Sequence, residues 1–191
     1  MLVSVIIPTK GERPDMIKEA IASVESQTLQ PCELLIYGPE HGVNKINKAI
    51  TKSKGDAFLL LSDDDILEDT YIQRTAEEMV SQQADIVATA LRIFGKGFTR
   101  GDNDVHGPGK HPFFTSLCKK SMWEKAGKWD QSMGGMADAE FWYRCFKAGG
   151  TWSIIGEPLY NYRKHPTQDS LTVDWKESRK RIIEKHPEYE F

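Results

Sequence analysis

Hydrophobic positions in the first half of the chain follow two different spacings. Short, nearly continuous apolar runs are typical of strands buried on both faces, whereas apolar residues one helical turn apart form the buried face of a helix. Residues 14–27 show the helical spacing, with Ile17, Ile21 and Val24 on one stripe, and Pro14 suits a first helical turn. The pattern predicts strands over residues 3–7, 33–37, 57–61 and 85–91, and helices over residues 14–27, 43–53 and 70–83.

The alternation of these strands and helices predicts an α/β fold. Parallel neighbouring strands need a crossover connection, which is usually a helix. Strands separated by helices of this length therefore imply a mostly parallel sheet that is flanked by helices, with right-handed crossovers. A chain of 191 residues is long enough to bury the core of one domain. We therefore expect residues 1–191 to form a single domain.

The composition changes near Gly95. Residues 94–112 contain five glycines and two prolines, and long loops in compact domains are often functional. We therefore expect a mobile loop over residues 94–112. The residues that follow it are rich in aromatic side chains, most of which we expect to lie in the core.

Composition excludes several classes of protein. A net charge of −3 and a pI near 6.0 give no electrostatic basis for a nucleic-acid partner. The three cysteines form no CxxC pair and indicate free thiols in a reducing compartment. The apolar N-terminus lacks a basic start and is interrupted by Pro8, so it predicts a first strand instead of a signal peptide. No apolar run approaches the roughly 18 residues of a transmembrane segment, so we expect a cytoplasmic protein.

Three consecutive carboxylates follow the third predicted strand. Asp63, Asp64 and Asp65 follow an apolar run after one serine, and in open α/β sheets ligands bind at the carboxyl ends of the strands. Three adjacent carboxylates repel one another unless a cation or strong hydrogen-bond donors offset the charge, and Mg²⁺ takes oxygen ligands of this kind. The alternative is an acidic turn that caps the helix near Asp69.

Two further groups of polar residues occur in the second half. Asp138 falls at the start of a predicted helix after Gly134 and Gly135, and Glu140 and Arg144 are one turn apart on that helix. An N-cap and a surface ion pair are the simplest interpretation. Later, an alternating run ends in His165, which could complete a metal site or contact a phosphate.

In their order and spacing these motifs resemble the family 2 glycosyltransferases of the GT-A fold, from about residue 3 to residue 170. The resemblance rests on residues 4–9, the helix that contains Asn47, the aspartate run, the turn at residues 125–130, the helix from Asp138 to Arg144, and residues 162–165. It implies a GT-A fold and a nucleotide-diphosphate sugar donor, most simply a UDP-sugar. It also implies a Mg²⁺ or Mn²⁺ ion held by the aspartates, and transfer with inversion to a carbohydrate or lipid-linked acceptor.

The resemblance assigns roles to residues on both sides of the 94–112 loop. Residues 1–93 would form the nucleotide-binding half and residues 113–173 the acceptor-binding and catalytic half, with residues 174–191 as a C-terminal helix or tail. Asp138 takes the place of the catalytic base. The implied metal ligands are Asp64, Asp65 and His165. The implied donor-binding residues are Pro8, Thr9, Lys10, Glu12, Gly38, Asn47 and Asp63.

Three positions depart from the family pattern and keep other functions open. Gly38 stands where an aspartate usually reads the nucleotide base, Ile46 where an arginine is common, and Ala137 where an acid precedes the catalytic aspartate. These departures leave a non-catalytic module that binds a sugar nucleotide or a glycan as an alternative. A nucleotidyltransferase is a further alternative, but it would be expected to have a glycine-rich basic loop after the first strand, and residues 9–13 contain one glycine.

Overall fold

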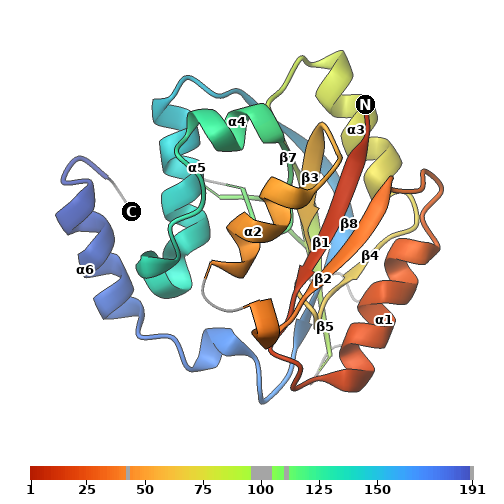
Figure 1. Cartoon of the computed structure of the whole chain (residues 1–191), viewed down its shortest axis with the longest axis horizontal. Coiled ribbons are helices and arrows are strands. Elements are labelled where there is room, and N and C mark those ends of the chain that lie inside the picture. The colour runs from red at the N-terminus through yellow and green to blue at the C-terminus, as the bar shows by residue number, and fades with distance from the viewer. Residues whose placement is uncertain (42–43, 96–104, 110–111, 190–191) are drawn as a thin grey trace.

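The computed structural model describes residues 1–41, 44–95, 105–109 and 112–189, which form one mixed sheet with helices on both faces (Figure 1). The strands are β1 (Val3–Pro8), β2 (Glu33–Tyr37), β3 (Ala57–Leu60), β4 (Ile66–Leu67), β5 (Ile86–Gly95), β6 (Val105–His106), β7 (Leu117–Lys119) and β8 (Trp152–Lys164). The helices are α1 (Pro14–Glu25), α2 (Lys45–Lys52), α3 (Tyr71–Ser81), α4 (Lys120–Lys125), α5 (Ala137–Lys147) and α6 (Trp175–Lys185). Short 3-10 helices cover Pro39–His41, Gln131–Met136 and Asp169–Leu171.

The sheet combines parallel and antiparallel pairs in the order β2-β1-β3-β7-β5-β8-β4, with β6 paired to β5. Strand β1 is parallel to β2 and β3, and β5 is parallel to β8, so most paired residues belong to parallel ladders as expected. Strand β7 lies between β3 and β5 and is antiparallel to both. The sheet is therefore mixed at this point, because a short strand that follows the 94–112 loop lies between β3 and β5.

The long ladder between β5 and β8 is irregular near its middle. Its register shifts on both sides of Ala90. Thr89 is paired with Ile155 and Leu91 with Tyr160, so β8 advances by five residues where β5 advances by two. After this irregular stretch the ladder continues regularly to the pair of Gly95 and Lys164.

The predicted 94–112 loop is only partly described. Strand β5 continues to Gly95, and β6 pairs Val105 and His106 with Arg92 and Leu91. Residues 96–104 and 110–111 lie outside the described part, so the expected mobility of the loop stays a prediction.

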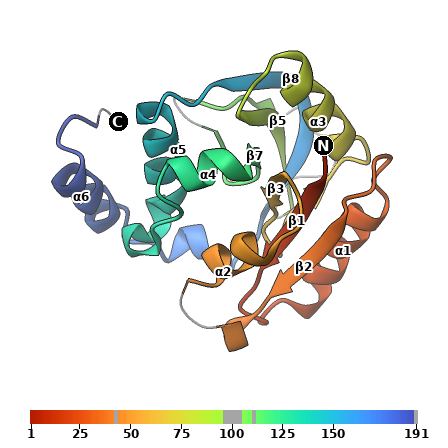
Figure 2. The ribbon, with the colours of Figure 1, turned by 45° about the horizontal axis from the view of Figure 1, so that its top comes forward.

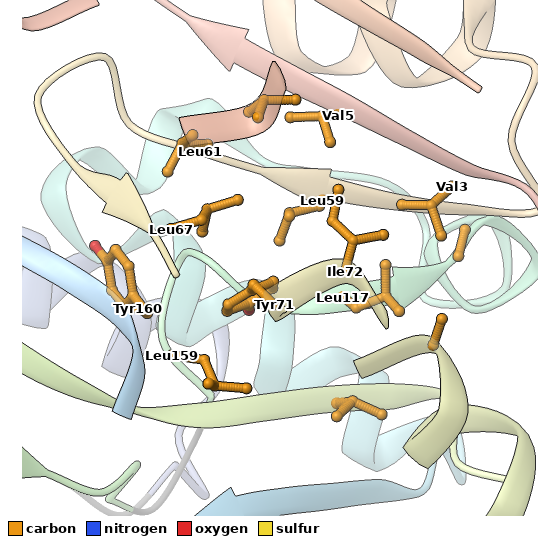
Figure 3. Close-up of a cluster of buried hydrophobic side chains, with 14 of the residues drawn as sticks. Val3, Val5, Leu59, Leu61, Leu67, Tyr71, Ile72, Leu117, Leu159 and Tyr160 are labelled. Carbon is orange, nitrogen blue, oxygen red and sulfur yellow. The ribbon is translucent and has the colours of Figure 1, made fainter. Parts of the chain in front are cut away.

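The apolar runs are explained by a sheet that is covered on both faces (Figure 2). Along β1, Val5 belongs to one hydrophobic cluster and Ile6 to the other, and Leu59 and Leu60 divide in the same way along β3. Figure 3 shows the first cluster, where α3 contributes Tyr71 and Ile72, and Tyr160 reaches in from β8. None of the helices within the described residues is both long and apolar enough to cross a membrane.

Candidate active site

A cavity of about 560 Å³ opens at the carboxyl ends of β1 and β3. Pro8, Thr9, Asp63 and Asp64 contribute from these strand ends, and Asp138 contributes from the start of α5. The segment after β8 closes another side with residues 168–170, 173 and 175. The position agrees with the rule that ligands bind beyond the carboxyl ends of strands in α/β sheets.

The parallel pairing of β1 and β3 brings the first two polar groups together. Ile6 is paired with Leu60, so both strands end at the same edge. Just beyond it, the Thr9 hydroxyl donates a hydrogen bond of 2.5 Å to Asp63 Oδ2. All three aspartates are buried, with 4%, 9% and 1% of Asp63, Asp64 and Asp65 exposed.

Arg13 lies between the carboxylates of Asp63 and Asp64. Its Nη1 is 2.7 Å from Asp63 Oδ1 and 2.8 Å from Asp64 Oδ2, and its Nη2 is 2.8 Å from Asp169 Oδ1. Burial alone would lower the pKa of Arg13, but the attraction of these three carboxylates outweighs it and raises the pKa above its ordinary value. The sequence interpretation missed Arg13. The available signal was its place in the loop after β1, at the edge where the aspartates were expected.

His165 also reaches Asp64, another of the implied metal ligands. Its Nε2 is 3.0 Å from Asp64 Oδ2, and its Nδ1 is 3.0 Å from the hydroxyl of Thr167. The ring is buried, and its backbone N–H donates to the side chain of Gln168. Asp64 Oδ2 therefore has two close nitrogen partners, one from the loop after β1 and one from the end of β8.

Asp65 is separate from the other two aspartates. It does not line the cavity; its Oδ2 accepts a hydrogen bond from the Tyr160 hydroxyl and its Oδ1 accepts one from the backbone of Arg163. Burial, together with the charge of Asp64, raises the pKa of Asp65 to about 8. Asp65 therefore joins the aspartate turn to β8, which differs from the metal-ligand role that the resemblance implied.

These contacts test whether the predicted metal ligands fit a divalent ion. Arg13 already contacts both Asp63 and Asp64, and Asp65 faces β8. Within the described ranges, no three His, Cys, Asp or Glu side chains are grouped so that they could hold a metal. In this arrangement the donor set does not fit the ion, and Mg²⁺ or Mn²⁺ stays a prediction made from the sequence.

Asp138 faces the same cavity from α5. It lies in the first turn of the helix, after the N-cap residue Met136, so it is not the cap itself. Its Oδ1 accepts a hydrogen bond of 2.8 Å from the backbone N–H of Ala139. The preceding Gly135 also lines the cavity, and a Cβ atom there would lie 2.2 Å from Val173. A glycine at this position lets the segment after β8 pack closely beside Asp138.

Glu140 has a structural environment that the sequence interpretation did not anticipate. Its side chain is fully buried and accepts two hydrogen bonds from Arg144, at 2.7 and 2.8 Å. Lys185 Nζ and His186 Nε2 lie 2.8 and 2.9 Å from it. Burial would raise the pKa of Glu140, but these partners lower it below the ordinary value. The predicted pair of Glu140 and Arg144 forms, but it is buried and not at the surface. Glu140 joins α5 to the end of α6 and lies outside the cavity lining.

The implied donor-binding residues divide into two groups. Pro8, Thr9, Lys10 and Asp63 line the cavity, whereas Glu12, Gly38 and Asn47 do not. Glu12 is exposed, and Gly38 is buried beside the Glu40 side chain.

Asn47 has its amide engaged elsewhere. It donates to the carbonyl of Trp129 at 2.7 Å and accepts from the Trp129 N–H and the Trp123 indole. Two residues earlier on α2, Lys45 lines the cavity and donates to the Thr9 carbonyl. Burial lowers the pKa of Lys45.

Solved structures provide the comparison with known proteins, since the sequence matches no protein-family model and no curated protein. The structure of S. aureus TarS covers 100% of this chain at a TM-score of 0.70 and 15% identity, and this chain spans 40% of that TarS chain. TarS 1–349 in complex with UDP-GlcNAc gives a TM-score of 0.74 at 14% identity over 68% of its length, and the complex with UDP gives 0.68 at 13% over 67%. Membership of family 2 stays a prediction. The likeness shows the fold: this chain has the α/β fold of GT-A type that was predicted from its sequence.

Proposed function

We propose that this protein transfers a sugar from a nucleotide-diphosphate donor, a UDP-sugar, to a hydroxyl group of a carbohydrate or lipid-linked acceptor. The observation that carries the proposal is one cavity with cationic side chains on one side and an acid on another. Lys10, Arg13 and Lys45 line it near the strand ends, and Asp138 lines it from α5. Its volume of about 560 Å³ lies within the range of roughly 300–1,000 Å³ for small-molecule sites.

The cationic residues suit the leaving group of such a donor. When the bond between the anomeric carbon and the diphosphate oxygen breaks, the electron pair stays with the diphosphate. Fixed positive groups that face the place where this charge develops stabilise the transition state more than the ground state. Lys10, Arg13 and Lys45 are the cavity-lining residues that supply such groups.

Asp138 suits the other half of the reaction. An acceptor hydroxyl is a weak nucleophile, and a carboxylate that takes its proton during attack accelerates the step. The acceptor oxygen forms the new bond to the anomeric carbon, its proton passes to Asp138, and the nucleoside diphosphate leaves from the opposite face. Attack opposite the leaving group inverts the configuration at that carbon. The likeness to TarS, which was crystallised with UDP-GlcNAc, supports this class of donor.

The test is a panel of nucleotide sugars measured by thermal shift and by release of the nucleotide. UDP-GlcNAc, UDP-glucose and GDP-mannose are each added with EDTA and, separately, with MnCl₂. A ligand that binds only the folded protein raises the melting temperature, and a concentration of 100 times Kd stabilises by about 2.7 kcal/mol. We expect at least one UDP-sugar to raise the melting temperature and to be hydrolysed slowly to UDP without an acceptor.

Free N-acetylglucosamine and UMP serve as ligand controls, because neither carries the diphosphate. Binding of a UDP-sugar without hydrolysis or transfer to any acceptor would favour the non-catalytic module. Equal melting temperatures with and without every nucleotide sugar would contradict the proposal.

A further inference from the structure

We propose that Arg13 supplies the positive charge that the resemblance gives to a metal ion, so that nucleotide diphosphate binds at Asp63 and Asp64 without a divalent cation. This inference rests on the proposed function for its ligand. Its first support is that one atom, Arg13 Nη1, lies 2.7 Å from Asp63 and 2.8 Å from Asp64. A single guanidinium thus occupies the position between both carboxylates.

Burial makes this contact an important one. Only 10% of the Arg13 side chain is exposed, against 6% and 12% of those of Asp63 and Asp64. Buried carboxylates need a counterion or several hydrogen-bond donors, because leaving the charge unpaired costs several kcal/mol. Arg13 meets this need for both residues, and Thr9 and His165 each add one further contact.

The start of α1 and the segment after β8 fix the position of Arg13. It is the N-cap residue of α1, and its carbonyl accepts the hydrogen bond of the Ile17 N–H at 3.0 Å. Pro14 follows it and restricts its backbone. On the other side, Nη2 donates to the Thr167 carbonyl at 3.2 Å and to Asp169 at 2.8 Å. The guanidinium is therefore held before any ligand enters, which reduces the entropy that binding must overcome.

Three cationic and four acidic side chains line the cavity among the described residues. The two buried acids, Asp63 and Asp64, both pair with Arg13. Lys45 donates to the Thr9 carbonyl instead, so its charge adds to that of Arg13 at the strand ends. A divalent ion at the aspartates would have to displace Arg13 or lie beside it, and two cations at that distance repel each other.

Uptake of Mn²⁺ tests the inference without a nucleotide. The electron paramagnetic resonance signal of free Mn²⁺ is followed as protein is added. We expect the parent protein to leave the signal unchanged, and Arg13→Gln to reduce it by binding one ion, because the two carboxylates lose their counterion. The double variant Arg13→Gln, Asp64→Asn should lose that binding again. Stoichiometric uptake of Mn²⁺ by the parent protein would overturn the inference.

Calorimetry in EDTA and in MnCl₂ measures the affinity for UDP, and it tests whether the nucleotide binds without a divalent cation. The parent protein should bind UDP in EDTA with a Kd within about threefold of its value in MnCl₂. Arg13→Gln should weaken binding in EDTA by about tenfold or more. Arg13→Lys keeps the positive charge but loses the planar guanidinium group, so its Kd in EDTA should lie between those of the parent and Arg13→Gln. Arg74→Gln is the matched control, because Arg74 pairs with Glu157 on the surface away from the cavity.

The outcomes separate this inference from the proposed function. UDP binding that appears only with Mn²⁺ would overturn the role of Arg13 and leave the proposed function intact. No UDP binding in either solution would contradict the proposed function, and the Mn²⁺ titration would still decide whether Arg13 excludes the ion. Circular dichroism checks that each variant is folded. If Arg13→Gln does not fold, the same measurements on Arg13→Lys test the inference.

Discussion

The hydroxyl of Tyr160 donates a hydrogen bond of 2.5 Å to the buried carboxyl group of Asp65. Tyr160 belongs to β8 and also packs in the hydrophobic cluster of Figure 3. The bond therefore ties the aspartate turn after β3 to a strand on the far side of β5 and β7. It holds the residue next to Asp64 without using space in the cavity.

Removing this hydroxyl should destabilise the fold. Tyr160→Phe keeps the ring and leaves a buried carboxyl group without one of its donors, which costs about 1–3 kcal/mol. Urea unfolding followed by fluorescence measures the loss. Tyr143→Phe is the matched control, since its hydroxyl bonds to Glu188 in an exposed pair, and a change of roughly 0.5 kcal/mol or less is expected there. Equal unfolding midpoints for Tyr160→Phe and the parent would show that the bond contributes nothing.

Asn47 should act on stability and not on donor binding. Asn47→Ala removes a donor to the Trp129 carbonyl and an acceptor for the Trp129 N–H, and the groups left behind cost about 1–3 kcal/mol. Asn47→Asp keeps the acceptor but places a carboxylate against the carbonyl, so it should be at least as damaging. At a temperature where both variants are folded, the Kd for UDP should equal the parent value. A weaker Kd in the folded variants would restore the donor-binding role implied by the resemblance.

Lys45 and Lys48 offer a matched pair for the electrostatics of the cavity. Both belong to α2, but Lys45 lines the cavity and Lys48 is exposed outside the lining. Lys45→Met should weaken UDP binding by about tenfold, because one charge near a phosphate contributes on the order of 1–2 kcal/mol. Lys48→Met should leave the Kd unchanged. Similar effects of both variants would mean that long-range charge, and not contact, governs binding.

Asp138 should control the rate of transfer and not the binding of the donor. Asp138→Asn preserves an oxygen that can accept from the Ala139 N–H and removes the basic carboxylate, so transfer should fall by about 10²–10⁴-fold. The Kd for the UDP-sugar should stay the same. Asp15→Asn, at an exposed position that pairs with Lys18, is the control. Near-parental transfer by Asp138→Asn would leave Asp138 with a structural role, and buried Glu140 could not replace it as the base.

Acid should weaken the attachment of α6 through Asp130. Although burial alone would raise the pKa of Asp130, hydrogen bonds from Lys185 and Ser132 lower it from 3.8 to about 2. A lowered pKa in the folded state stabilises above the unfolded value, and this contribution is lost as the pH falls from about 4 to about 2. Asp130→Asn should therefore reduce the free energy of unfolding by about 0.5–1 kcal/mol at pH 7, because the pair is partly exposed. The two proteins should become equal near pH 2, whereas exposed Glu184→Gln should match the parent throughout.

The residues of the site that could be predicted from the sequence are those whose positions are set by the ends of the strands. Apolar runs identify β1 and β3, parallel pairing places their ends at one edge, and the polar residues that follow them, Thr9 and Asp63, meet there. A glycine pair and a helical pattern mark the start of α5, and the resemblance selected Asp138 there. These signals are local in the chain, so one sequence contains them.

The missing parts depend on contacts between distant residues. Arg13 and Asp169 are 156 positions apart, and no local pattern indicates that they pair. Strands β4 and β7, which contain two and three residues, are too short to show a period. Burial of a polar side chain cannot be predicted from local sequence either. The spacing of Glu140 and Arg144 is typical of an exposed pair, and only the contacts with Lys185 and His186, about 45 residues later, show that Glu140 is buried.

The irregular pairing around Ala90 has a consequence for insertions and deletions. Side chains alternate between the two faces of a strand. Between the pairs Thr89–Ile155 and Leu91–Tyr160, β8 has three more residues than β5, and these extra residues are taken up by the irregular stretch. As a result Tyr160 lies on the same face of the sheet as its partner Leu91. Deleting one residue there, such as Gly156, would turn Tyr160 away from Asp65 and displace His165, which follows the end of β8. Substitution is a smaller change, since a Cβ atom at Gly156 meets no atom within 4 Å. At Gly156 the length of the chain is therefore constrained far more tightly than the identity of the residue.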